Sequence, residues 1–224
     1  MRLLQLINFF VGRWMLAKNF FIGSTLNYIN RKRNIDKNYL DYIRLSALEL
    51  VSHEINKTGI EGNVAELGVY KGKFARYINQ YFPERKLYLF DTFEGFDKRD
   101  INKEKELHLT SGEQNFSDTS LQKVLDQMKF PGQCIPVKGY FPESASAIED
   151  KFVFVSLDAD LYQPIYSGLR FFYPMLVKGG YIFVHDFNNV NYKGVSEAVK
   201  KFCNEENIGF VPIPDSGGTA IITK

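Results

Sequence analysis

Residues 152–186 read FVFVSLDADLYQPIYSGLRFFYPMLVKGGYIFVHD and contain two apolar segments separated by a stretch with helical periodicity. Phe152–Leu157 and Tyr181–His185 are continuous apolar runs, as expected of strands buried on both faces. Between them, Pro164–Val177 predicts a helix that is closed by Lys178-Gly179-Gly180. A strand, a helix and a second strand of this kind indicate a parallel unit whose helix crosses over the sheet.

The same alternation of strands and helices runs through most of the chain. Near the C-terminus it stops, because Phe210–Ile213 and Thr219–Thr223 predict two strands joined by a tight turn, which makes them antiparallel. The sequence therefore predicts an α/β fold with a doubly wound, mostly parallel sheet, a C-terminal antiparallel strand and additional N-terminal helices. The other predicted strands are Asn63–Leu67, Lys86–Asp91 and Cys134–Lys138, and the other predicted helices are Tyr39–Lys57, Lys73–Phe82, Ser117–Lys129, the short Pro142–Glu149, and Lys193–Glu206.

Length and composition limit the classes of function. A chain of 224 residues favours one main domain with one active site. Its 28 basic and 26 acidic residues give a net charge of +2, too little for a dedicated nucleic-acid binder, so we expect a small-molecule or glycan partner and no nucleic acid. Cys134 and Cys203 form neither a zinc motif nor a disulfide framework, which favours the cytoplasm.

The N-terminal residues form a separate segment. Residues 1–23 are dense in apolar and aromatic side chains, but charges at Arg2, Arg13 and Lys18 leave no run long enough to span a membrane. We therefore expect residues 1–40 to be a helical extension and residues 41–224 to be the catalytic domain. The extension would serve as a lid or as a homo-oligomer contact. The alternative is a peripheral contact with the inner face of a membrane.

Two predicted strand ends suggest a nucleoside site. In doubly wound sheets ligands bind beyond the carboxyl ends of the strands. Glu66 and Gly68 follow the first strand, where the carboxylate suits a ligand ammonium and the glycine permits a close approach to the backbone. Asp91 ends the second strand and could accept hydrogen bonds from ribose hydroxyls. These residues alone do not distinguish S-adenosylmethionine (SAM) from a nicotinamide dinucleotide, and each also has a purely structural interpretation.

Acidic residues also cluster at the ends of two later strands. Asp158 and Asp186 could hold Mg²⁺, which would lower the pKa of a substrate hydroxyl, and Asp160 could accept the proton. His185 is a third candidate ligand, although it could equally orient a ligand or simply pack, because histidine is not the usual ligand of Mg²⁺. The long polar segment Asp97–Thr119 is expected to be a lid or binding loop, the alternative being a disordered surface insert.

From about Tyr42 to the C-terminus the sequence resembles the macrocin O-methyltransferase family, which includes sugar-modifying enzymes of antibiotic biosynthesis. Six segments in one order carry this resemblance: Val64–Gly72 (VAELGVYKG), Leu89–Phe96 (LFDTFEGF), Lys138–Glu143 (KGYFPE), Leu157–Tyr162 (LDADLY), Leu169–Pro174 (LRFFYP) and Lys178–Asp186 (KGGYIFVHD).

The resemblance implies a class I methyltransferase fold with SAM as methyl donor, a divalent metal and a sugar or phenol-like hydroxyl as acceptor. It implies that Asp158 and Asp186 bind the metal and that Asp160 is the general base. Many relatives have two consecutive acids where this chain has His185-Asp186, which leaves the identity of the metal open. The expected SAM-binding residues are Glu66, Gly68, Tyr70, Gly72, Asp91, Thr92 and Gly139.

Other classes fit less well. A nucleic-acid methyltransferase should carry an Asn/Asp-Pro-Pro-aromatic motif, which Asp158–Tyr162 lacks. A nicotinamide-dependent oxidoreductase should carry GxGxxG and would not explain the acidic cluster. Two alternatives stay open: a non-catalytic SAM-binding or scaffolding protein of the same fold, and a methyltransferase with a non-sugar acceptor.

Overall fold

The computed structural model describes Phe9, residues 41–109 and residues 115–224. By contacts the chain divides into two units, Met1–Asn38 and Tyr39–Lys224. The predictions made for residues 1–40 therefore lie outside the described residues, apart from Phe9.

The second unit is built on one seven-stranded sheet in the order β3-β2-β1-β4-β5-β7-β6. The first five strands along the chain pair in parallel, and β7 pairs antiparallel with both β5 and β6. This arrangement confirms the predicted doubly wound sheet with its antiparallel C-terminal strand. The strands are β1 (Asn63–Leu67), β2 (Leu87–Asp91), β3 (Cys134–Lys138), β4 (Phe152–Leu157), β5 (Leu176–Val184), β6 (Val211–Ile213) and β7 (Thr219–Thr223).

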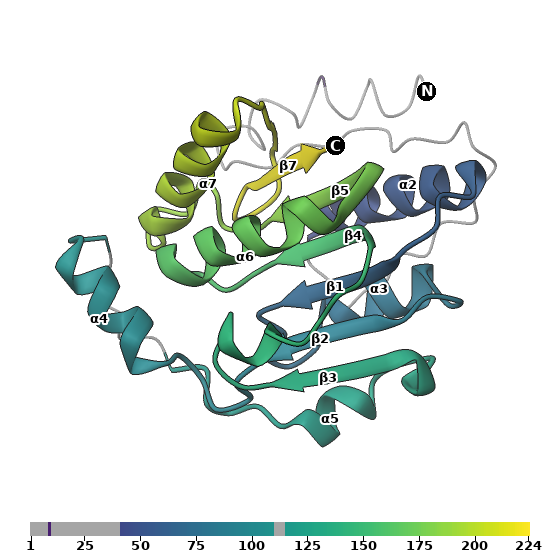
Figure 1. Cartoon of the computed structure of the whole chain (residues 1–224), viewed down its shortest axis with the longest axis horizontal. Coiled ribbons are helices and arrows are strands. Elements are labelled where there is room, and N and C mark those ends of the chain that lie inside the picture. Colours follow the sequence, from purple (N-terminus) through teal and green to yellow (C-terminus); the bar gives the residue numbers. More distant parts are fainter. Residues whose placement is uncertain (1–8, 10–40, 110–114) are drawn as a thin grey trace. The chain divides into compact units, whose positions relative to one another are not determined.

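Helices cover both faces of the sheet (Figure 1). The helices are α2 (Tyr42–Thr58), α3 (Ala75–Tyr81), α4 (Lys98–Glu106), α5 (Leu121–Leu125), α6 (Tyr162–Met175) and α7 (Lys193–Glu206), with single 3₁₀ turns at Pro131–Gln133 and Glu143–Ala145.

Each face of the sheet has its own apolar core. On one face, α6 and α7 pack against the sheet through side chains such as Leu169, Phe172 and Phe202. On the other, α2, α3 and α5 pack against it through side chains such as Leu48 and Ile78. Every residue of β4 is buried, which explains why its sequence is a continuous apolar run.

The prediction for the end of α6 and the start of β5 was wrong. Lys178-Gly179-Gly180 does not close the helix but lies inside β5, which begins at Leu176. Phe152 pairs with Leu176 and Phe154 with Tyr181, so the glycines form a bulge in β5 opposite β4. Gly179 has φ +82° and donates its N–H to the carbonyl of Lys224. Glycine therefore serves a strand irregularity here, and the sequence pattern does not distinguish that role from a helix end.

The segment Asp97–Thr119 was predicted to be a loop, yet α4 occupies its first part. Asp97 caps this helix by accepting a hydrogen bond from the Arg99 N–H, 2.8 Å away. Most residues of α4 are charged, and two of them, Asp100 and Glu104, are buried and hold the helix in place. Residues 110–114 lie outside the described residues. Two other predicted helices are shorter than expected: Ser117–Lys129 is reduced to α5, and Pro142–Glu149 to one 3₁₀ turn.

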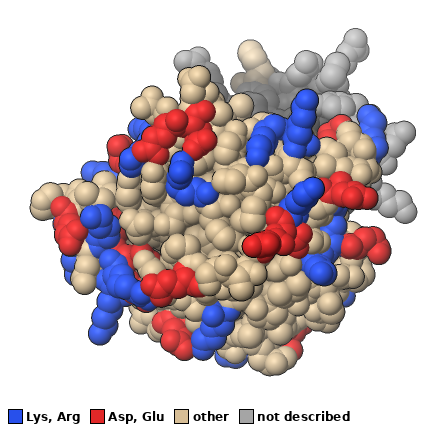
Figure 2. Space-filling model, in the orientation of Figure 1, with Lys and Arg blue, Asp and Glu red and all other residues tan. Residues whose placement is uncertain are grey.

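The surface agrees with the composition. On the face drawn in Figure 2, basic and acidic side chains of the described residues are interspersed. Among the residues that the structure describes, none of the helices is both long enough and apolar enough to cross a membrane.

Candidate active site

A cavity of about 390 Å³ opens at the carboxyl ends of β1, β2, β4 and β5. The strand order reverses between β1 and β4, the place where doubly wound sheets bind their ligands. Of the residues predicted to form the site, ten line this cavity: Glu66, Gly68, Tyr70, Asp91, Thr92, Gly139, Asp158, Asp160, His185 and Asp186.

The turn that follows β1 brings the backbone against the next strand end. Gly68 has φ +84°, and a Cβ atom placed there would lie 2.1 Å from the carbonyl oxygen of Asp158. Only glycine permits this approach. Gly72 is different from the other predicted residues, because it does not line the cavity. A Cβ atom at Gly72 would meet the side chains of Val124 and Met128, so this glycine serves the packing of α5.

Asp91 fastens this turn. Its Oδ2 accepts hydrogen bonds from the backbone N–H groups of Val69 and Tyr70, at 2.7 and 2.8 Å, and its Oδ1 accepts one from Phe93 at 2.6 Å. Oδ1 has a further lone pair, so a ribose hydroxyl could still donate to it. Asp91 therefore has a particular structural role, which is to hold the turn after β1 through backbone N–H groups.

Glu66 is a buried acid with an unused oxygen. Its residue surface is 1% exposed. Its Oε2 has no hydrogen-bond partner among the described residues. Burial first, and the nearby charge of Asp158 second, raise the pKa of Glu66 well above its usual value. A buried carboxyl with one oxygen unpartnered is well suited to receive the cationic group of a ligand.

The acids at the ends of β4 and β5 converge on His185. The His185 Nδ1 lies 3.1 Å from Asp158 Oδ1 and 3.0 Å from Asp186 Oδ2. Asp186 also accepts a hydrogen bond from Asn189 at 2.7 Å. Asp160 lies next to Asp186, and the two carboxyl groups shift each other's pKa. All four predicted residues of the metal and proton-transfer chemistry therefore lie together, as their strand-end positions predicted.

Charges within the cluster shift the pKa values strongly. Burial would raise the pKa of Asp158, but the charges of Arg44 and His185 outweigh it and hold that pKa well below its usual range. Burial would lower the pKa of His185, but Asp158 and the hydrogen bonds to both acids raise it to about 10. The pKa of Asp160 is raised well above its usual value by burial and then by Asp158 and Asp186. Arg44 and His185 are thus the cationic side chains that face the carboxylates of Asp158 and Asp186. Asp160 is the acid of this cluster that most readily holds a proton.

Sequence reasoning missed Arg44, which contributes one of these charges. It lies in the first turn of α2 and its residue surface is 3% exposed. Its Nη1 donates to Asp158 Oδ2 at 2.9 Å and its Nη2 to Ser156 Oγ at 3.3 Å. The available signal was spacing, because Arg44 shares a buried helix face with Leu48, Ser52 and Ile55.

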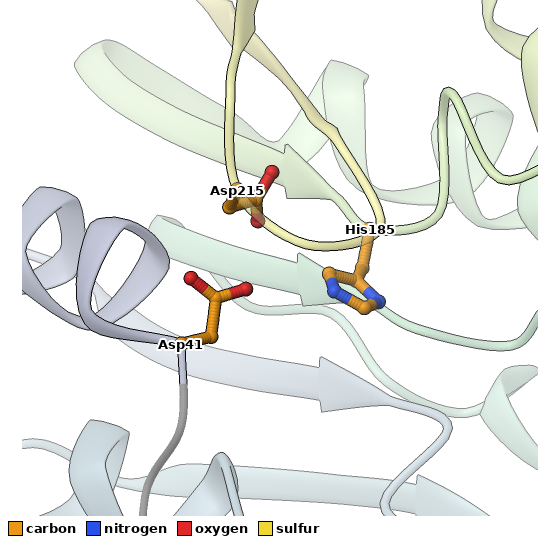
Figure 3. Close-up of side chains that lie close together, drawn as sticks. All are labelled: Asp41, His185 and Asp215. Atoms are coloured by element: carbon orange, nitrogen blue, oxygen red, sulfur yellow. The ribbon is translucent and has the colours of Figure 1, made fainter. Parts of the chain in front are cut away.

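A second pair of acids lies close to His185 (Figure 3). Asp41 precedes α2, and Asp215 lies in the turn between β6 and β7. Ligand atoms of these acids and of the histidine lie within 4.8 Å of one another. Asp41 Oδ2 also accepts hydrogen bonds from the N–H and Oγ of Ser216, at 3.1 and 3.2 Å, so it joins α2 to the β6–β7 turn.

The other wall of the cavity includes side chains from α4 and from the segment after β3. Asp100 on α4 accepts a hydrogen bond from the Tyr140 hydroxyl at 3.0 Å. Burial raises the pKa of Asp100 to about 6. Arg99 stacks on the ring of Tyr140, with its Cζ 3.5 Å from the ring centroid. Of these three residues, Asp100 and Tyr140 line the cavity, where they can hydrogen-bond a polyhydroxy compound and offer it an aromatic ring.

A protein-family model described as macrocin-O-methyltransferase (TylF) matches residues 36–216. No curated protein sequence is significantly similar to this chain.

Several solved structures share the fold. The calicheamicin methyltransferase CalS11 is 19% identical with a TM-score of 0.65, covering 80% of this chain and 78% of that one. The O-methyltransferase NovP is 18% identical with a TM-score of 0.64, covering 81% and 79%. The O-methyltransferase TomG from Streptomyces achromogenes, solved in complex with SAM, is 11% identical with a TM-score of 0.52, covering 80% of each chain.

Proposed function

The chain belongs to the macrocin O-methyltransferase family, and we propose that it transfers a methyl group from SAM to a hydroxyl of a sugar or glycosylated small molecule. The observation that carries this proposal is the cavity, in which the predicted donor residues Glu66 and Asp91 lie beside the acidic cluster of Asp158, Asp160 and Asp186. The sugar-modifying activity named for CalS11, a TDP-rhamnose methyltransferase, supports the choice of acceptor class.

The donor would bind over the turn after β1. Gly68 lines the cavity without a side chain and would leave the backbone open to the donor, Asp91 Oδ1 would accept a hydrogen bond from a ribose hydroxyl, and Glu66 would face the ammonium of the methionine part. Glu66 Oε2 has no hydrogen-bond partner among the described residues, which supports a bound cation at that position. Tyr70, Thr92 and Gly139 line the same part of the cavity and complete the proposed donor site.

Asp158, His185 and Asp186 would fit a divalent cation if binding displaced the proton of His185, since their ligand atoms lie within 4.8 Å of one another. A bound cation would lower the pKa of the acceptor hydroxyl and orient it for attack on the methyl group. Histidine favours Mn²⁺ more than Mg²⁺, so this chain could use either ion. Arg44 and His185 already offset part of the negative charge of Asp158, so the cation would compete with these two side chains for its carboxylate.

Asp160 is proposed to take the proton from the acceptor hydroxyl. It lines the cavity next to Asp158 and Asp186 and is not committed to a basic side chain by any ion pair found among the described residues. Burial and the neighbouring acids raise the pKa of Asp160, so its carboxylate is a stronger base than that of an exposed aspartate. The chain's further contribution is to align the acceptor and to keep water out of the cavity.

The test is methyl transfer from isotope-labelled SAM to a panel of free sugars, nucleotide sugars and glycolipids, in EDTA and with Mg²⁺ or Mn²⁺. We expect label in at least one hydroxyl-bearing acceptor, loss of turnover in EDTA, and recovery with either ion. Full turnover in EDTA would reject the metal and leave Arg44 and His185 as the charges that support the acceptor. Binding of SAM without transfer to any acceptor class would favour the non-catalytic alternative.

A further inference from the structure

Arg44 is a buried guanidinium that faces the donor half of the cavity. It lines the cavity together with Glu66 and Gly68. Its contacts to Asp158 and Ser156 fix two of its nitrogen atoms, and its Cζ lies 3.8 Å from the centroid of the Phe74 ring. A guanidinium held on three sides is preorganised for a planar anion, and its five N–H donors allow it to serve several acceptors at once.

Arg44 and Glu66 are neighbouring basic and acidic side chains. Ser156 Oγ accepts a hydrogen bond from Arg44 Nη2 at 3.3 Å and also lies close enough to Glu66 to lower the pKa of that carboxyl. Glu66 also pairs with Ser156 across β1 and β4. A guanidinium and a carboxyl group are therefore held side by side at the edge of the cavity, with the Oε2 of the carboxyl group unpartnered among the described residues.

The methionine part of SAM carries an ammonium and a carboxylate on the same carbon atom. Transferring either charge from water into a protein cavity is unfavourable unless a group of opposite charge receives it. An adjacent acid and base match such a zwitterion better than an acid alone. Arg44 also lies in the first turn of α2, so the positive end of that helix dipole adds to its charge.

We propose that Arg44 binds the α-carboxylate of SAM while Glu66 binds its α-ammonium, an inference that rests on the proposed use of SAM. Arg44 is then a donor-binding residue contributed by the helix that precedes β1. Its bond to Asp158 links the donor site to the acidic cluster, because one guanidinium contacts both.

Three ligands and two variants test this role by equilibrium titration of the full chain. SAM carries both charged groups, decarboxylated SAM lacks only the carboxylate, and 5′-methylthioadenosine lacks both. Wild-type protein should bind SAM about tenfold more tightly than decarboxylated SAM, as expected for a hydrogen-bonded charge pair. In Arg44→Gln that preference should disappear, while the affinity for 5′-methylthioadenosine stays within about twofold of wild type.

The matched control is Arg85→Gln. Arg85 hydrogen-bonds the carbonyls of Ile60 and Gly62 and does not line the cavity, so its loss tests the effect of removing a structural arginine. This variant should keep the wild-type preference for SAM over decarboxylated SAM. Should Arg44→Gln fail to fold, Arg44→Lys takes its place, because lysine keeps the charge but loses the planar fork. Its preference for SAM over decarboxylated SAM should then be smaller than that of the wild type.

Two results would overturn the inference while leaving the proposed function intact. One is equal binding of SAM and decarboxylated SAM by the wild type. The other is an Arg44→Gln variant that loses the same factor of affinity for all three ligands, which would reduce Arg44 to a structural support. A wild-type protein that binds none of the three would instead reject the proposed function itself.

Discussion

Asp160 is the residue on which the proposed proton transfer depends. Its backbone has φ +61°, a conformation that is uncommon for a residue with a side chain. Tyr70 and Asp186, which also line the cavity, have positive φ angles of 48° and 59°. Such conformations often cluster at functional sites, where the surrounding structure enforces them. Here they turn the chain sharply at three strand ends and direct the side chains into one cavity.

Asp160→Asn should therefore separate binding from chemistry. The variant keeps the size and most hydrogen bonds of the side chain but cannot accept the proton, so kcat should fall by about 100-fold or more. Its affinity for SAM, measured by titration, should stay within about twofold of wild type because Asp160 is not part of the proposed donor site. A wild-type kcat with a verified acceptor would exclude Asp160 as the base.

Asp100 gives a prediction about stability and pH. Burial raises its pKa from the usual 3.8 to about 6, so the folded chain keeps a proton that the unfolded chain releases. The associated stabilisation is complete below about pH 4 and is lost as the pH rises to about 6. Asp100→Asn has no carboxyl group to ionise, so it does not lose stability over this pH range. Its side-chain oxygen can still accept the hydrogen bond from Tyr140.

The free energy of unfolding of Asp100→Asn, relative to wild type, should thus increase by about 1–2 kcal/mol between pH 4 and pH 7. Urea unfolding at several pH values measures this difference. A difference that is constant with pH would mean that Asp100 has the same pKa in the folded and unfolded chain.

Among the secondary-structure elements, the contact between the turn after β1 and the end of β4 defines the floor of the cavity. Gly68→Ala would place a Cβ atom 2.1 Å from the carbonyl oxygen of Asp158, and this backbone atom cannot move without shifting β4. The variant should lose several kcal/mol of stability, or lose SAM binding if the strands separate.

Gly132→Ala is the matched control for this substitution, because a Cβ atom at Gly132 meets nothing within 4 Å. Thermal unfolding and SAM titration of both variants give the comparison. Equal behaviour of the two alanine variants would contradict the close approach at Gly68.

The elements that the sequence predicted best are those whose packing is periodic. The bounds of β1, β3, β4, β7 and α7 were predicted correctly. The reason is clearest for β4, which is buried throughout, and for α7, which has one apolar face. The errors lie where one residue type serves two structures. Glycines both end helices and form strand bulges, and for this reason the start of β5 was predicted at the wrong residue. The sequence of α4 is so rich in charged residues that it resembles a loop.

The site was predictable to the extent that it follows from strand ends. Parallel strands bring their carboxyl ends to one edge, so Glu66, Asp91, Asp158 and His185 could be placed together from sequence. Arg44 and Asp215 could not, since they reach the site from a helix and a turn whose positions depend on tertiary packing. The structural role of Asp91 was likewise missed, because its partners are backbone N–H groups.

Along the whole chain, the proposed donor residues all lie between residues 44 and 139. A chain that lacks residues 1–23 should therefore bind SAM with unchanged affinity, because its donor site is intact. We expect it to lose acceptor turnover or its native oligomeric state. The reason is that the apolar side chains of residues 1–23 have to be buried, either against the acceptor side of the site or against a partner chain. Titration, turnover with a verified acceptor and sedimentation measure the three properties.

The rival for residues 1–23 is a contact with a membrane surface, which their basic residues would favour at anionic lipids. Co-sedimentation of the full chain with anionic vesicles distinguishes the two. Salt-sensitive binding to vesicles, together with unchanged oligomeric state and unchanged turnover of a soluble acceptor after truncation, would replace the lid or oligomer contact by a membrane contact.

The donor site is tested most directly by isothermal titration of the full chain with SAM, in EDTA and with Mg²⁺, for wild type and Asp91→Ala. We expect one SAM per chain for wild type in both conditions. Asp91→Ala should bind at least about tenfold more weakly, because it loses both the ribose acceptor and the bonds to Val69 and Tyr70. A wild-type chain that does not bind SAM, or an Asp91→Ala variant that binds it as well as wild type, would contradict the donor site proposed at the ends of β1 and β2.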